Sequence, residues 1–283
     1  MNRNERENRP SVVSYRDRLR ITLLVLLCAF AIHCTRLAAA PVKVVILIGE
    51  DEYKTWETLP EFAKTELEPR GMQVTIIQQD PKDINNFPGL VEALPSADLL
   101  LVSTRRRLAP KEQIDAIRAF LNAGKPLVGI RTACHAFAPP LASKKNPVTQ
   151  PALPGSGWPE FDPEVLGGHY TNHNPPGPKV AISLAPGAEA SEILKGVDVS
   201  QLIGQGSLYR VAPLDPSCVP LLIGTIPDQP AQPVAWTHFY GPKQSRIFYT
   251  SLGHPDDFKE PAFRKLLLNG IFWSLQVAPT ALP

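Results

Sequence analysis

The stretch VKVVILIG (residues 42–49) decides the fold of this 283-residue chain. It is an unbroken apolar run of strand length, which is typical of a strand buried on both faces of a parallel sheet. A helical pattern follows over 59–71, and QVTIIQQ (73–79) predicts a second strand. A strand, a helix and a strand in this order predict a parallel pair with a crossover helix.

The same alternation continues along the chain. ADLLLVST (97–104) predicts a third strand, APKEQIDAIRAFLNAGK (109–125) a helix, and PLVGI (126–130) a fourth strand. Further strands are expected at 179–184, 207–212, 219–226, 233–240 and 245–253, before a helix at 261–276. We therefore expect a single α/β domain with a mostly parallel central sheet and helices on both faces.

The first forty residues differ from the rest in composition. Arg16, Arg18 and Arg20 precede the apolar run 21–32, and small residues end at Ala40. This order is typical of a signal peptide or of an uncleaved N-terminal anchor, so we expect a periplasmic or extracellular protein. The predicted organisation is a signal peptide or anchor at 1–40, one domain at 41–278 and a short tail at 279–283.

The charge of the chain depends on that leader. Of the 29 Lys/Arg and 27 Asp/Glu residues, 7 and 3 lie in segment 1–40, so its removal changes the net charge from +2 to −2. Nothing in this balance indicates a nucleic-acid partner. Membrane contact is expected only through the N-terminal segment, and the sequence leaves a homo-oligomer open.

Four polar stretches directly follow predicted strands. They are GEDEY (49–53), STRRR (103–107), RTACHAF (131–137) and GHPDD (253–257). In an open α/β sheet, ligands bind at the carboxyl ends of the strands. We therefore expect these stretches to meet at one edge of the sheet and to form the functional site.

Cys134 and His135 raise the question of a cysteine nucleophile. A catalytic cysteine needs a base, and side chains of adjacent residues seldom point at each other, so His254 would have to serve instead of His135. The alternative is a buried free cysteine that packs as a small apolar residue. Cys134 and Cys218 could also pair, but the sequence does not fix the distance between them.

His169 and His173 lie in the loop sequence GGHYTNHN (167–174). Two histidines four residues apart can bind one metal ion, and zinc or another divalent metal needs three or four ligands. The other ligands would come from Glu50, Asp51, His135 or Asp256. The alternative is a pair of polar loop histidines that hydrogen-bond to backbone or substrate.

His254 and Asp256 form a second histidine–carboxylate pattern. An aspartate can orient an imidazole and stabilise its charged form. The alternative is a surface turn in which Pro255 fixes the backbone and Asp256 or Asp257 caps it.

Other side chains near these strand ends are candidates for substrate contacts. Carboxylates can hold a cation, arginines such as Arg105 and Arg131 can grip an anion or sugar hydroxyls, and aromatic rings can stack on a sugar. Alternatively, these groups are a helix-terminal acidic run, solvated arginines and core aromatics. The predicted contacts are Glu50, Asp51, Tyr53, Arg105, Cys134, Tyr170, His173 and Trp236.

Six stretches together resemble the trehalose-utilisation (ThuA-like) family. They are ILIGEDEYKTWETLPEFAK (46–64), LLLVSTRRR (99–107), VGIRTACHAF (128–137), GGHYTNH (167–173), PVAWTHFYG (233–241) and RIFYTSLGHPDDF (246–258). The resemblance covers about residues 42–275 and implies a class I glutamine amidotransferase-like (flavodoxin-like) fold.

The resemblance also bears on the cysteine question. In glutamine amidotransferases the nucleophilic cysteine sits two residues after a strand-terminal glycine, and here Arg131 holds that place after Gly129. The HPE end of the amidotransferase triad resembles His254–Pro255–Asp256. The nucleophile is therefore expected to be lost, which argues against glutamine hydrolysis and favours a rebuilt site.

The family's link to trehalose implies a carbohydrate substrate. We expect a hydrolase, lyase or isomerase that processes a disaccharide or keto sugar by histidine acid/base or metal-assisted chemistry. The predicted catalytic residues are Arg131, His135, His169, His254 and Asp256. Two alternatives stay open, namely a non-catalytic sugar-binding protein on the same scaffold and an amidase that depends on Cys134.

Overall fold

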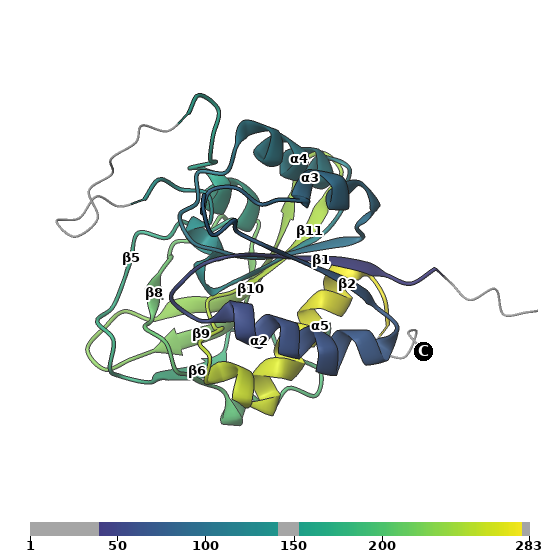
Figure 1. The fold of residues 1–283 in the computed structure, drawn as a ribbon. Coiled ribbons are helices and arrows are strands. Elements are labelled where there is room, and N and C mark those ends of the chain that lie inside the picture. The colour runs from purple at the N-terminus through teal and green to yellow at the C-terminus, as the bar shows by residue number, and fades with distance from the viewer. Residues whose placement is uncertain (1–39, 141–152, 279–283) are drawn as a thin grey trace, which may run out of the picture. The chain divides into compact units, whose positions relative to one another are not determined.

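The computed structural model describes residues 40–140 and 153–278 (Figure 1). The predicted signal peptide or anchor and the predicted tail at 279–283 lie outside the described residues. The chain divides into two units, Met1–Ala40 and Pro41–Pro283. Within the described part of the chain, no helix is long and apolar enough to cross a membrane.

A nine-stranded mixed sheet forms the centre of the second unit. Its order is β2-β1-β3-β4-β11-β10-β9-β6-β7, and the first five strands in this order run parallel. These five are β2 (Gln73–Gln78), β1 (Lys43–Gly49), β3 (Leu99–Thr104), β4 (Leu127–Ile130) and β11 (Ser245–Thr250). The predicted α/β fold is confirmed, with the run at 42–49 as an inner strand.

Antiparallel strands extend the sheet beyond β11. They are β10 (Gln232–Tyr240), β9 (Val219–Thr225), β6 (Val180–Leu184) and β7 (Ile203–Gly204). The strand expected at 207–212 shortens to β8 (Tyr209–Arg210), which pairs with β5 (Asn172–His173) in a separate small sheet. These two short strands hold the loop segments that carry part of the site.

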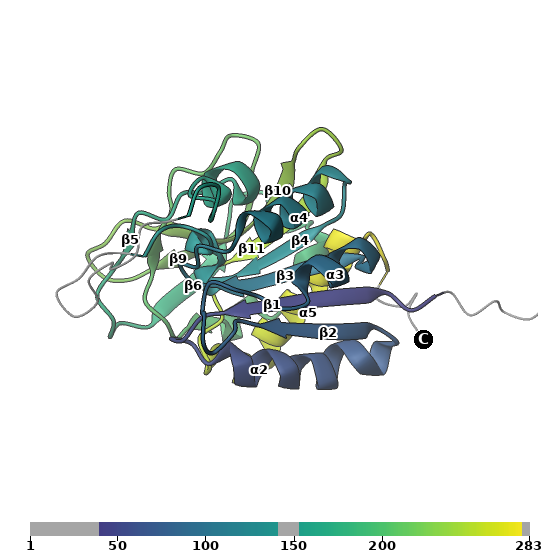
Figure 2. The ribbon, with the colours of Figure 1, turned by 45° about the horizontal axis from the view of Figure 1, so that its top comes forward.

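Helices cover both faces of the sheet (Figure 2). The helices α2 (Thr55–Phe62) and α5 (Pro261–Leu275) cover one face, while α3 (Leu90–Ala93) and α4 (Lys111–Asn122) cover the other. Side chains of a strand alternate between faces, so Val44 and Ile46 pack towards α2 and α5. Val45 and Leu47 pack towards α3 and α4. This two-sided burial explains why β1 is apolar at every position.

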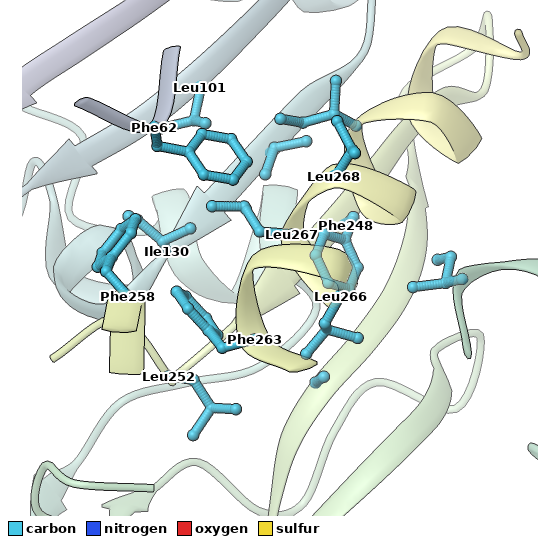
Figure 3. Packing of buried hydrophobic residues seen from close by; sticks show 14 of the residues in the cluster. Phe62, Leu101, Ile130, Phe248, Leu252, Phe258, Phe263, Leu266, Leu267 and Leu268 are labelled. Atoms are coloured by element: carbon cyan, nitrogen blue, oxygen red, sulfur yellow. The ribbon is translucent and has the colours of Figure 1, made fainter. Parts of the chain in front are cut away.

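The core around α5 fixes how close that helix lies to the sheet (Figure 3). Phe263, Leu266 and Leu267 pack against strand residues that include Phe248. Gly270 faces the Phe248 ring so closely that any added Cβ would collide with it. A larger residue at 270 would therefore have to push α5 away from the sheet.

Two predicted helices differ from the observed ones at their ends. The helix expected over 59–71 begins at Thr55, continues as a π-helical turn at Ala63–Leu67 and a 3₁₀ turn at Glu68–Arg70, and stops at Gly71. Gly71 has a φ of 74°, a left-handed conformation that glycine adopts without strain. The four-residue helix α3 was not predicted, because so short an element carries too few periodic positions.

Candidate functional site at the carboxyl ends of the parallel strands

The four polar stretches that follow β1, β3, β4 and β11 meet at one edge of the sheet. The backbone N–H of Arg105 donates to the Gly49 carbonyl, and that of Arg106 donates to the His135 carbonyl, both at 2.9 Å. The rings of Tyr53 and His254 lie 6.1 Å apart. The strand ends thus place side chains from distant parts of the sequence in one cluster.

Arg131 directly follows β4 in a strained turn. Its φ of 45° is unusual for a residue other than glycine, and the Tyr249 hydroxyl donates to its carbonyl at 2.7 Å. Strained turns of this kind present nucleophiles at the ends of strands in other enzymes, and strain of this sort clusters at functional sites. The turn is therefore present, with an arginine in place of a nucleophile.

The guanidinium of Arg131 is enclosed, with only 2% of the residue exposed. It donates to the carbonyls of Ser251 (2.7 Å) and Ser207 (3.1 Å), and to the hydroxyls of Tyr53 (3.1 Å) and Ser207 (3.2 Å). Its carbon lies 4.6 Å from the ring centre of Tyr53 and 4.1 Å from that of Tyr209. Buried charges are normally paired, yet none of the described carboxylates lies within 4.0 Å of it.

A chain of rings connects Arg131 to three of the predicted histidines. The ring of Tyr170 lies 4.3 Å from that of His135 and 4.8 Å from that of Tyr209. His173 lies 6.3 Å from Tyr209, and His254 reaches the same cluster through Tyr53. Tyr209 therefore occupies the centre of the site.

His135 is buried and stays uncharged at neutral pH. Burial holds its pKa well below the ordinary value, and the positive charges of Arg106, Arg105 and Arg131 lower it further. Its Nδ1 lies 3.3 Å from the Cys134 sulfur. The expectation that these adjacent side chains would not meet is therefore wrong, because the tight turn after β4 folds both inward.

Cys134 is fully buried, and its contact with His135 does not create a thiolate. Burial raises the pKa of the Cys134 thiol, while His135 resists protonation. The two groups therefore form a neutral pair, the opposite of a thiolate–imidazolium nucleophile. Cys134 has no exposed surface with which to contact a substrate, so the structure contradicts that prediction and the Cys134 amidase. Cys134 and Cys218 are both free thiols.

Asp162 and His169 form a hydrogen-bonded pair in the loop that precedes β5. Asp162 begins a π-helical turn (Asp162–Leu166), and its Oδ2 lies 3.0 Å from His169 Nδ1. The same oxygen accepts the backbone N–H of Tyr170 at 2.8 Å. Burial raises the pKa of Asp162 to about 6, although the Tyr170 N–H and His169 oppose that rise. The imidazole is exposed, so a buried carboxylate orients a histidine whose Nε2 is open to a ligand.

His173 is exposed and is oriented by backbone rather than by a carboxylate. Its Nδ1 donates to the Asn174 carbonyl at 2.9 Å, which leaves Nε2 as the ring nitrogen with a lone pair. The Asn174 side chain accepts from Arg210 Nη2 at 2.7 Å. Among the described residues, no group of three or more His, Cys, Asp and Glu side chains is arranged to hold a metal.

The turn after β11 orients His254 through backbone groups. The N–H of Asp256 donates to His254 Nδ1 at 3.2 Å, whereas the Asp256 carboxylate lies 3.6 Å away and contacts Lys259 at 2.6 Å. Buried Asp257 accepts the N–H groups of Gly253 (2.8 Å) and His254 (2.9 Å). The geometry thus supports the alternative interpretation of this stretch as a turn, and Asp257 caps it.

The acidic stretch after β1 serves mainly its own loop. The Glu50 carboxylate is buried and accepts the N–H groups of Glu52, Tyr53 and Thr55 at 2.6–2.7 Å. It therefore positions Tyr53, and no free oxygen remains to bind substrate as predicted. Exposed Asp51 lies 4.0 Å from Arg105, which pairs more closely with Glu52, at 2.7 Å.

Trp236 belongs to the core rather than to the site. It is completely buried, its Nε1 donates to the Leu166 carbonyl at 2.6 Å, and its ring packs 4.4 Å from that of Tyr249. The structure contradicts the predicted substrate contact because β10 lies inside the sheet, where its side chains are covered on both faces.

Asp162 and Asp257 contribute to the site, but the sequence did not predict them as site residues. Asp162 lies seven residues before His169 in a proline-rich segment that lacks a recognisable period, so no spacing rule connects the two. Asp257 was considered only as a turn cap. Aromatic rings were expected to stack on a sugar, but nothing in the sequence indicated the central position of Tyr209.

The fold defines an α/β protein whose polar strand ends cluster at one edge of the central sheet. The chain belongs to the trehalose-utilisation (ThuA) family, whose sequence model matches residues 43–274. This membership suggests a role in carbohydrate utilisation.

Solved structures show the same fold. A ThuA-like protein of Bacteroides uniformis ATCC 8492 is 19% identical with a TM-score of 0.62, covering 89% of this chain and 98% of that chain. One of Parabacteroides merdae ATCC 43184 is 17% identical with a TM-score of 0.57, covering 86% and 93%. Among curated proteins, none matches the chain in sequence.

Proposed function

We propose that the protein is an enzyme that processes an oxidised (keto) disaccharide by acid/base chemistry, with His169 as the group that transfers the proton. The observation that carries this proposal is the 3.0 Å contact between exposed His169 and buried Asp162. A histidine held by a carboxylate on one nitrogen can take a proton on the other.

The proposed chemical step is proton abstraction next to the sugar carbonyl. The C–H proton passes to Nε2 of His169, and the electron pair moves onto the carbonyl oxygen as an enolate. Asp162 stabilises the imidazolium, and the fixed positive charge of Arg131 stabilises the enolate. In an isomerase, the proton of the adjacent hydroxyl moves to the enolate oxygen, and His169 returns its proton to the former carbonyl carbon, so the carbonyl shifts to the neighbouring carbon. In a lyase, the enolate re-forms the carbonyl and expels the glycosidic oxygen, which takes the proton from His169.

The other predicted catalytic groups receive lesser roles in this proposal. Neutral His135 stacks on Tyr170 and can share a hydrogen bond with substrate without carrying charge. His254, beside Tyr53, would bind a sugar hydroxyl. In the metal-assisted alternative, His169 and His173 would bind a divalent ion such as zinc through Nε2.

The test is turnover of keto-disaccharides by His169→Gln, with His173→Gln as the matched control. Loss of turnover only in the first variant supports the acid/base mechanism. Equal turnover by wild type and His169→Gln contradicts it. Equal loss in both variants, with metal found by elemental mass spectrometry, favours the metal-assisted route. Thermal stabilisation by sugar without turnover identifies a binding protein instead.

We also propose that segment 1–40 directs export. The expected outcome is a mature chain that begins near residue 41 in the periplasm or medium, and N-terminal sequencing of the purified protein checks it. An intact leader on a membrane-bound product would identify an anchor instead.

A further inference from the structure

We propose that the sugar bound at this site carries a carboxylate, and that Arg106 binds this group while Arg131 supplies a second positive charge behind it. This inference rests on the proposed function, because it names the substrate class of the same site. It follows from two guanidiniums without carboxylate partners and from the buried Nε of Arg131, which lacks a hydrogen-bond partner.

Arg106 lies at the edge of the site beside His135. Its backbone N–H donates to the His135 carbonyl at 2.9 Å, and its Nη1 donates to the Pro139 carbonyl at 2.7 Å. The residue is half-buried, and none of the described carboxylates lies within 4.0 Å of its guanidinium. Burial lowers its pKa, but arginine remains charged at neutral pH. The remaining donors can therefore bind an oxyanion.

Arg131 adds a positive charge that the protein leaves uncompensated. Its partners are neutral carbonyls and hydroxyls, and its buried Nε has no hydrogen-bond partner. A buried charge of this kind is costly unless an opposite charge arrives nearby. Both Arg131 and Arg106 influence His135 electrostatically, so both guanidiniums lie near this ring.

The neighbouring arginines differ from Arg106 and Arg131 in having carboxylate partners. Arg105 pairs with Glu52 at 2.7 Å, and Arg107 lies 3.7 Å from Asp51. None of the described carboxylates lies within 4.0 Å of Arg106 or Arg131. A carboxylate on the ligand would supply the missing partner.

The test is isothermal titration of the full chain with D-glucuronate, D-glucose and D-glucose 6-phosphate at low salt. Glucuronate is expected to bind about tenfold more tightly than glucose, with an advantage that shrinks as salt is added. Arg106→Gln should abolish the advantage, and Arg106→Lys should retain part of it. Arg70→Gln removes one charge from an arginine paired with Glu66 and should leave the advantage intact.

Several outcomes would overturn the inference. They are equal binding of glucuronate and glucose, no binding of any of the three ligands, and an advantage that survives in Arg106→Gln. Tighter binding of glucose 6-phosphate than of glucuronate would show that the site prefers a phosphate to a carboxylate. Turnover of neutral keto-disaccharides separates the two proposals. Turnover without a preference for glucuronate supports the proposed enzyme and contradicts the acidic substrate. Glucuronate binding at Arg106 without turnover of any keto sugar supports the acidic ligand and contradicts the proposed enzyme.

Discussion

Two histidines of the site, His135 and His169, each contact a neighbouring acidic group, yet they have opposite properties. His135 is buried against the Cys134 thiol, and its pKa is held well below the ordinary value. His169 is exposed, and its partner Asp162 is the buried member of the pair. The comparison teaches that burial of the imidazole itself can hold a histidine neutral even when another titratable group contacts it.

The largest effect in this comparison is expected from His169→Ala. Turnover should fall about 10²–10⁴-fold, because general acid–base catalysis contributes that much. Steady-state kinetics measures the loss, and the melting temperature should change little since the imidazole is exposed. An activity within a few-fold of wild type would place proton transfer elsewhere.

Asp162→Asn is expected to have the next largest effect. A residue that orients a functional histidine is typically worth about 10–100-fold, so kcat should fall by that amount. In the wild type, turnover should fall as the pH drops through about 6, where Asp162 takes up a proton and loses its charge. The pH profile of kcat checks the sign. A profile in Asp162→Asn that matches the wild type would contradict this role.

The protonation state of His135 can be followed by spectroscopy. Its imidazole should remain neutral as the pH falls through the ordinary histidine value of about 6.5, because burial and three arginines disfavour its charged form. Ring resonances in NMR titrations check this, with His135→Gln to assign the signal. A midpoint at or above the ordinary value would show that the site is open to water at this position.

Cys134→Ser should have the smallest effect on function. The buried thiol is not ionised, so turnover should stay within a few-fold of wild type. The free energy of unfolding should fall by about 1–3 kcal/mol, because a hydroxyl replaces an apolar sulfur in the core. Chemical denaturation measures the change. Loss of turnover in a folded Cys134→Ser variant would restore the cysteine mechanism.

The sequence predicted the sheet more completely than it predicted the site. The apolar run of β1 and the helix that became α4 each carry a local signal of period, and the place of Arg131 after Gly129 came from the family resemblance. Trp236 and Glu50 were expected to face the site, but one is covered inside the sheet and the other folds into its own loop. Side-chain direction at such positions depends on neighbours that are distant in the sequence.

The sequence by itself determined the α/β class, the family and the polar strand ends, because periodicity and motifs are properties of neighbouring residues. The tertiary structure decided which side chains in those stretches can act. It joined Asp162 to His169, buried Cys134 against His135, and placed Tyr209 between Arg131 and Tyr170. Burial and electrostatic surroundings arise only when segments far apart in the chain pack together, and these two quantities set the charge of each group.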